Sequence, residues 1–367
     1  MITRFSNSAK HFRCTLVAFI LLFAGQRRAF EHFPVLSSTA YGSSVDVLKQ
    51  DWPSASKFQN RPSAPSVLNI DKALRVITRD PHPLGSLQQK KLAQWMTKLL
   101  KHWGWKAEEQ RFTARVPMQT AKDSHQKKDL RFEERTGRNV IASRAGPDDC
   151  AFIIAGHYDS KYFPAGTHFV GANDGGSSTA LMLELARLWM HPSQALQPKQ
   201  KSSGTWFDCD VVLAFFDGEE AFLPEWSDGE RILGVRDNLY GSRDFVNRLP
   251  RNGQNVVWKR KKPIKLLLNI DMIGHKKQNL FITDGSDPLL SEQLIALRGA
   301  VQLRRVPLSV EDDHLPFLRM GVPLIHVIDW TNLAEWHTKD DTLDIVSPEK
   351  IAAFLEVIMR FSERKRS

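Results

Sequence analysis

The sequence predicts an α/β fold in which a mostly parallel central sheet carries helices on both faces. Five short segments are apolar at consecutive positions, which is typical of parallel strands buried on both faces. Helical segments with one apolar face accompany them, as α/β layering requires. With 367 residues, 42% hydrophobic and 25% charged, the chain can bury a full core and is neither disordered nor fibrous. We expect the strands at 139–143, 151–160, 211–216, 265–274 and 323–329.

The first 34 residues (1–34) have the pattern of a secretory signal with a short flank, either cleaved or kept as an anchor. Basic residues precede the apolar run 14–25, and this order is typical of export signals. The run is short for a membrane span. Residues 26–28 are unusual at a cleavage site, so an uncleaved anchor stays open. Both alternatives place the rest of the chain in the secretory pathway or outside the cell, with membrane contact only through residues 14–25.

The folded part is expected to start after a linker or loosely attached arm at 35–69. This segment is rich in Ser, Ala and Pro and has little periodicity. The folded domain is expected at 70–367. Its first clear element is an amphipathic helix with Ser86 as the cap and Gly104 at the end. The helices expected to cover the sheet lie at 177–190 and 347–361.

The charge and the cysteines restrict the partners and the compartment. The formal net charge of +10 is spread over separate patches such as 259–262 and 364–366. No stacking-aromatic or recognition-helix pattern accompanies these patches, so we expect a solvated surface and no nucleic-acid partner. We also expect a monomer. If the signal is cleaved, Cys150 and Cys209 remain. A disulfide is permitted there, and two buried thiols are the open alternative.

Side chains that can bind a metal follow the expected strands or lie in the loops beside them. Ligands of such sheets collect at the carboxyl ends of the strands, so we expect these side chains to converge. Singly, each has an ordinary explanation: Asp174 could cap a helix, Asp271 could face solvent, and His337 could be a surface histidine. Together they form a ligand set suited to zinc. That set is a His, Asp, Glu, Asp and His among the converging side chains, which are His157, Asp159, Asp174, Asp217, Glu219, Glu220, Asp271 and His337.

The motifs that contain these residues occur in a characteristic order. They are GHYDSKYF, FVGAND, FFDGEEAF, LYGSRDF, NIDMIG, DDHLPFLRMGVPLIHVI and EWHTKDDT. In this order they resemble the glutaminyl-peptide cyclotransferases (glutaminyl cyclases), which are similar in fold to the zinc-dependent aminopeptidases. The resemblance covers residues 70–361. The GAND aspartate, the paired glutamates and NIDMIG are common to both groups, whereas HYDSKYF, DDHLPFLR and the tryptophan before the last histidine favour the cyclases.

The resemblance implies how the metal and the two glutamates are used. It implies one zinc ion per chain, bound by Asp174, Glu220 and His337, and three protein ligands leave the open position of a catalytic zinc. It assigns proton transfer to Glu219. Neighbouring residues of an extended strand end point to opposite sides, which allows the two glutamates to have different roles. Asp217 would then serve the turn or support the site.

The implied reaction converts the N-terminal glutamine of a peptide or protein into pyroglutamate with release of ammonia. The zinc would polarise the side-chain amide, and Glu219 would move a proton from the attacking α-amine to the departing ammonia. Asp271 and Asp312 would form an acidic pair that shares a proton and donates a hydrogen bond to the tetrahedral intermediate. Trp226 and Trp336 would form walls of a small substrate pocket.

Two other functions stay open at this point. A zinc-dependent aminopeptidase with two metal ions is favoured by His157 and Asp271, which complete a five-ligand set, and by the wording GANDGGSSTA. A non-catalytic relative is the third alternative, although such proteins usually lose ligands and none is lost here. The chain also departs from the animal cyclases, because Gly156 stands where these carry a cysteine.

Overall fold

We describe the protein from a computed structural model, which covers residues 52–58, 64–119, 130–164, 166–190, 204–253 and 255–366. The expected signal or anchor at 1–34 lies outside the described residues. The folded unit comprises Trp52–Ser367. Within the part of the chain that the structure describes, no helix is long and apolar enough to cross a membrane.

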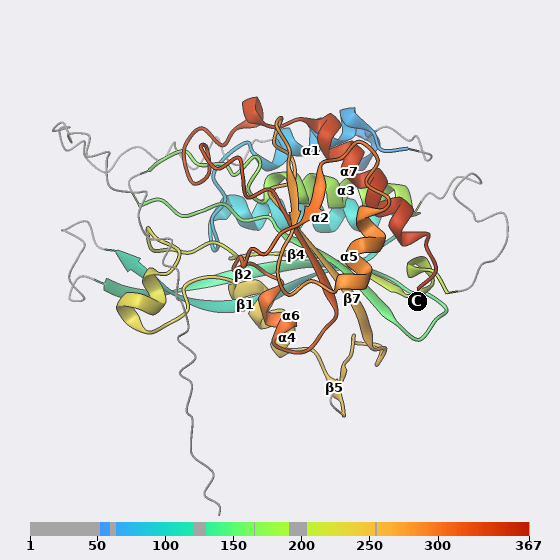
Figure 1. Cartoon of the computed structure of the whole chain (residues 1–367). Coiled ribbons are helices and arrows are strands. Elements are labelled where there is room, and N and C mark those ends of the chain that lie inside the picture. The colour runs from blue at the N-terminus through green and yellow to red at the C-terminus, as the bar shows by residue number, and fades with distance from the viewer. Residues whose placement is uncertain are drawn as a thin grey trace, which may run out of the picture. The chain divides into compact units, whose positions relative to one another are not determined.

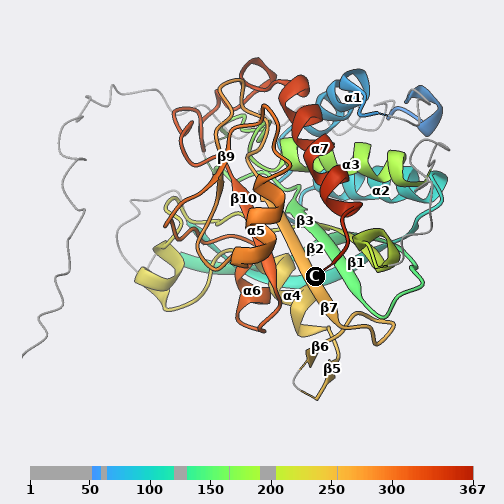
Figure 2. The same ribbon diagram turned by 45° about the vertical axis from the view of Figure 1, so that its right-hand side comes forward.

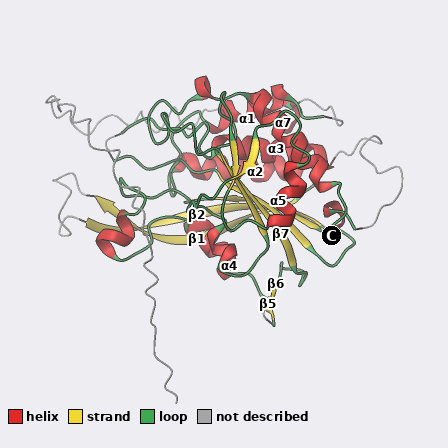
Figure 3. Cartoon of the chain, viewed as in Figure 1, coloured by secondary structure: helices red, strands yellow, loops and turns green. Residues whose placement is uncertain are grey.

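The described residues form a sheet of eight strands in the order β1-β2-β4-β3-β7-β10-β8-β9 (Figure 3). The central strands β4, β3, β7 and β10 are parallel to one another. The strands β1, β2 and β8 add antiparallel pairs at the two sides. The prediction of a mostly parallel α/β sheet is therefore confirmed. The bounds are β1 Lys106–Gln119, β2 Leu130–Arg144, β3 Ala151–His157, β4 Asp210–Phe216, β7 Ile264–Asp271, β8 Leu280–Ile282, β9 Leu303–Arg305 and β10 Leu324–Ile328.

All five apolar runs form strands of this sheet. Consecutive side chains of such a strand point to opposite faces of the sheet, and here both faces are buried. In β3, Phe152 and Ile154 belong to the core on one face, whereas Ile153 and Ala155 belong to the core on the other face. Every residue of β3 and β4 is buried. Period-two alternation of side chains explains why no polar position interrupts these strands.

Helices cover both faces of the sheet (Figures 1 and 2). The larger layer contains α1, α2, α3 and α7, and the smaller layer on the other face contains α4 and α6. The helix α5 packs beside α7. A short hairpin, β5 and β6, precedes β7. The bounds are α1 Val67–Ile77, α2 Leu87–His102, α3 Gly176–Met190, α4 Tyr240–Asn247, α5 Pro288–Ile295, α6 Leu315–Leu318, α7 Pro348–Ser362, β5 Arg251–Asn252 and β6 Asn255–Val256.

The helices begin where side-chain caps satisfy their first backbone amides. Ser86 Oγ accepts a hydrogen bond from the Gln89 amide, and Ser347 Oγ accepts one from the Lys350 amide. The three helices predicted from the sequence are thus confirmed as α2, α3 and α7. The segment expected as a linker or arm supplies Trp52 to the folded unit, where its ring lies 5.8 Å from the ring of Trp95.

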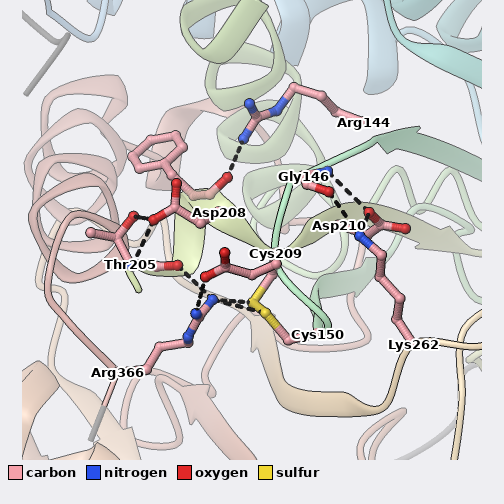
Figure 4. The surroundings of a disulfide bond; sticks show 11 residues. Arg144, Gly146, Cys150, Thr205, Asp208, Cys209, Asp210, Lys262 and Arg366 are labelled. Atoms are coloured by element: carbon pink, nitrogen blue, oxygen red, sulfur yellow. Dashed lines mark hydrogen bonds and ion pairs between the residues drawn. A yellow bond between two sulfur atoms is a disulfide. The ribbon is translucent and has the colours of Figure 1, made fainter. Parts of the chain in front are cut away.

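A disulfide joins Cys150 and Cys209 at the opposite end of the sheet from the carboxyl ends of the parallel strands (Figure 4). Each cysteine directly precedes a strand, β3 or β4, and the first residues of these strands are paired as Ala151 and Asp210. The open alternative of two thiols is therefore wrong in this structure. The Arg366 guanidinium donates to the Thr205 carbonyl oxygen, forms an ion pair with Asp148 and lies against both sulfur atoms.

The strands β1 and β2 form a long hairpin that reaches beyond the rest of the sheet. The two strands pair along their whole length, whereas β2 pairs with β4 only from Val140 to Arg144. On the inner face of the extension, Phe112 and Val116 pack with Phe222 and Tyr240. The hairpin therefore supports the loop that follows Glu220.

Candidate active site

The predicted site residues come together at the carboxyl ends of the parallel strands. His157 and Asp271 are the last residues of β3 and β7, and Glu219 and Glu220 follow β4 closely. The remaining residues come from loops, because Asp174 precedes α3 and His337 follows β10. This is the edge where ligands of parallel α/β sheets bind.

Asp174, Glu220 and His337 form a cluster with converging ligand atoms. His337 Nε2 lies 3.1 Å from Glu220 Oε2 and 3.5 Å from Asp174 Oδ2, and one ligand atom of each residue lies within 4.8 Å of the others. Asp174 Oδ2 and both Glu220 carboxylate oxygens are buried and have no hydrogen-bond partner among the described residues. Buried polar atoms without partners are unfavourable unless a ligand satisfies them.

Burial changes the protonation of this cluster. It raises the pKa of Glu220 to about 7 and lowers the pKa of His337 to about 4. His337 is therefore a neutral imidazole near neutral pH, and this is the form that binds a metal. Two oxygen ligands and one imidazole nitrogen match the donors of a catalytic zinc site.

A second cluster lies beside the first and shares Asp174 with it. His157 Nε2 lies 3.1 Å from Asp174 Oδ1 and 3.2 Å from Asp271 Oδ1. Burial acts to lower the pKa of His157, but the surrounding carboxylates, Asp271 first, raise it well above the usual value. The five residues of the aminopeptidase ligand set are thus close together.

Asp159, which was expected among the converging side chains, and Asp341, which was not singled out from the sequence, fix the loops that carry these residues. Asp159 accepts hydrogen bonds from the backbone amides of Glu219 (3.0 Å) and Glu220 (3.4 Å). Asp341 does the same for the amides of Asn173 (2.7 Å) and Asp174 (3.1 Å). Both aspartates are buried. Their positions in the HYD and HTKDD motifs are the signal that could have identified them.

The backbone at the site contains two residues in the left-handed region. His337 has φ of +55° and Met272, which follows Asp271, has φ of +50°. Such conformations are uncommon for residues other than glycine and occur often at functional sites. At Met272 the amide donates a 2.7 Å hydrogen bond to Asp271 Oδ1, which fixes that carboxylate.

Asp312 lies at the same edge but in a different hydrogen-bond network. His326 Nε2 lies 2.7 Å from Asp312 Oδ2, and Asn269 donates to the same oxygen. Burial acts to raise the pKa of Asp312, but His326 holds it well below the usual range. Burial raises the pKa of Asp271. The pKa values of the two predicted acidic residues are therefore shifted in opposite directions, upward for Asp271 and downward for Asp312.

A cavity of about 190 Å³ opens beside these carboxylates. Of the eight residues with a predicted catalytic, substrate-binding or metal-binding role, seven line it. Glu220 is the exception, and its Oε2 lies 3.1 Å from Nε2 of the lining residue His337. The Trp336 ring stacks on the His337 ring at 3.9 Å, and the Trp330 ring lies 5.4 Å from the Trp336 ring. The lining is Asp174, Glu219, Trp226, Asp271, Met272, Ser309, Val310, Glu311, Asp312, Ile328, Trp330, Trp336 and His337.

Comparison with known proteins identifies relatives of this chain. Residues 139–362 match peptidase family M28. A glutaminyl-peptide cyclotransferase of Bothrops jararaca is 32% identical in an alignment 285 residues long, which covers 70% of this chain and 70% of the relative. One from Boiga irregularis is 30% identical over 85% of this chain and 88% of its own.

Solved structures of a glutaminyl cyclase and of an aminopeptidase precursor are similar in fold to this chain. An Acidobacteriales bacterium glutaminyl cyclase is 28% identical, has a TM-score of 0.62, and covers 86% of this chain and 99% of its own. A leucine aminopeptidase precursor of Bacteroides thetaiotaomicron also has a TM-score of 0.62, at 16% identity over 83% of this chain and 99% of its own. At that identity the likeness shows the fold alone.

Proposed function

The chain belongs to peptidase family M28 and to the glutaminyl-peptide cyclotransferases, and we propose that its sheet-edge residues perform this family's reaction with one bound zinc ion. The enzyme converts the N-terminal glutamine of a peptide to pyroglutamate and ammonia. The cyclotransferase relatives support this activity over that of an aminopeptidase. The observation that carries the proposed residue roles is the convergence of Asp174, Glu220 and His337 beside a small cavity walled by tryptophans.

The proposed ligands are Asp174, Glu220 and His337. Asp174 Oδ2 and both Glu220 oxygens are buried without a hydrogen bond from the described residues, and together with the neutral imidazole they suit a divalent cation. A zinc ion bound there supplies Lewis-acid polarisation of the substrate's side-chain amide. Asp159 and Asp341 position two of these ligands through their backbone amides.

Glu219 is the proposed proton carrier. It lines the cavity, and burial raises its pKa well above the usual range, which brings a carboxylate toward the pH at which a general base is most effective. The α-nitrogen of the substrate attacks the side-chain carbonyl carbon, and the bond between that carbon and the amide nitrogen breaks. Glu219 takes the proton from the α-nitrogen and gives it to the leaving nitrogen, which departs as ammonia.

The remaining lining residues exclude water and hold the substrate. Trp226 and Trp336 form walls that restrict the cavity to one side chain, because bulky rings exclude water that would compete with the amine. Asp271 is the member of the acidic pair proposed to hold a proton, so it can donate a hydrogen bond to the oxygen of the attacked carbonyl. Asp312 stays ionised beside His326.

The reaction can be tested directly with synthetic peptides. A peptide that begins with glutamine should release one equivalent of ammonia, and mass spectrometry should show the loss of that mass with every peptide bond intact. A peptide that begins with asparagine should react poorly, because its shorter side chain cannot close a five-membered ring. Peptides that begin with leucine or alanine should be unchanged. Free N-terminal amino acids without pyroglutamate would contradict the proposal and favour an aminopeptidase.

The metal content is a separate expectation. Elemental analysis should find one zinc ion per chain, chelation should abolish the activity, and added zinc should restore it. The variant His157→Ala should retain the zinc, because His157 is not among the three proposed ligands. Two zinc ions per wild-type chain, with one of them lost together with activity in His157→Ala, would favour the two-metal arrangement instead.

Export remains a proposal for the N-terminal segment. The disulfide between Cys150 and Cys209 supports it, because such bonds persist in oxidising compartments. The choice between a cleaved signal and an anchor rests on residues 14–25, which lie outside the described part of the chain.

A further inference from the structure

Glu311 is a carboxylate in the cavity lining that the proposed mechanism does not use. Glu311 lines the cavity, and its Oε2 accepts a 2.8 Å hydrogen bond from the Trp226 indole nitrogen. The other lining carboxylates are buried, whereas Glu311 is partly exposed. Its second oxygen, Oε1, has no hydrogen-bond or ion-pair partner among the described residues. Glu311 therefore offers one unpaired carboxylate oxygen on the exposed side of the cavity.

Three tryptophans share this entrance with Glu311. Trp226, Trp330 and Trp336 all line the cavity and are all partly exposed. The described lining contains no lysine or arginine. We define these four residues, Trp226, Trp330, Trp336 and Glu311, as the mouth. A carboxylate among indole rings attracts a cation by charge and by cation–π contact.

The second residue of a substrate must pass the mouth. The N-terminal glutamine occupies the cavity in the proposed function, and this inference rests on that function. A cavity of about 190 Å³ holds little more than one side chain, so the chain after the glutamine leaves where the lining is exposed. We propose that the mouth selects peptides in which lysine or arginine follows the N-terminal glutamine and disfavours those in which an acidic residue follows it.

The test compares three peptides that differ only at position two. They are glutaminyl tripeptide amides with arginine, with citrulline as its neutral analogue, or with glutamate. For the wild-type enzyme, kcat/KM should fall in the order arginine, citrulline, glutamate, with about tenfold between the first and the last. High salt should reduce this ratio because it screens partly exposed charges.

The variant Glu311→Gln removes the charge and keeps an oxygen that can accept from the Trp226 indole. The ratio of kcat/KM between the arginine and glutamate peptides, taken within the variant, should fall about fivefold. The control Glu356→Gln neutralises an exposed carboxylate on α7, outside the cavity lining, and should behave as the wild type. Dissociation constants of the matching pyroglutamyl products, measured by calorimetry, should show the same order without turnover.

Equal kcat/KM for the three peptides, or a ratio that Glu311→Gln leaves unchanged, would overturn the inference while pyroglutamate formation still supports the proposed function. In that case Glu311 only holds Trp226 in place. Absence of pyroglutamate from all three peptides would refute the proposed function and this inference with it.

Discussion

Replacement of Glu219 by glutamine is expected to lower kcat by ~10²–10⁴-fold while one zinc ion per chain is retained. Glu219 lines the cavity but is not part of the cluster formed by Asp174, Glu220 and His337. The substitution keeps the shape of the side chain and removes the group that carries the proton. Asp159 binds the backbone amide of this residue, so the loop should keep its position.

The neighbouring variant Glu220→Ala should instead lose the zinc, because Glu220 Oε2 lies 3.1 Å from His337 Nε2 and neither carboxylate oxygen has a hydrogen-bond partner among the described residues. Zinc content and kcat should be measured on the same purified samples, with circular dichroism as a control for folding. Equal zinc loss in both variants, or full turnover in Glu219→Gln, would contradict the division of roles.

Removal of the disulfide by the double substitution Cys150→Ser and Cys209→Ser is expected to lower the free energy of unfolding by about 4 kcal/mol. The bond closes a loop with a sequence separation of 59 residues, and a loop of this length restricts the unfolded chain strongly. The measurement is denaturant unfolding of the wild-type and double-variant proteins, each with and without reductant. Reductant should destabilise the wild type and leave the double variant unchanged.

Activity provides an independent check of the same substitution. The cysteines precede β3 and β4, whereas the candidate site lies where these strands end. The folded double variant should therefore keep kcat near that of the wild type under conditions in which it stays folded. Equal unfolding free energies of the wild-type and double-variant proteins would show that the bond adds nothing to stability.

The parallel strands could be predicted from the sequence because each is marked by a short run of consecutive apolar residues. A run such as 211–216 has no polar residue, and a short run of this kind is typical of a strand covered on both faces. The strand β1 was not predicted, although its buried residues alternate from Phe112 to Val116. Pro117 and Met118 are both buried and interrupt the period of two. Of its partner β2, only the apolar run 139–143 was predicted.

The disulfide shows a second limit of prediction from the sequence. A separation of 59 residues gives no distance in space, so disulfide and thiols both stayed open. The register of β3 against β4 brings Ala151 opposite Asp210, and thereby the two preceding cysteines together. Such a register depends on non-local pairing, which a single sequence does not reveal.

The candidate site was predictable to the extent that its residues follow strands. The rule that ligands collect at the carboxyl ends of strands brought His157, Glu219 and Asp271 together. The supporting roles of Asp159 and Asp341 depend on which loop amides they face. Loop geometry of this kind is set by the folded backbone and not by residue type.

The origin of the proposed ligands in separate loops has a consequence for folding kinetics. Asp174, Glu220 and His337 are far apart in the chain, and they meet only after β3, β4 and β10 have taken their places in the sheet. Non-local pairings of this kind form slowly. A partly folded chain therefore lacks the complete site, so zinc should slow unfolding and stabilise the native state by mass action without accelerating refolding.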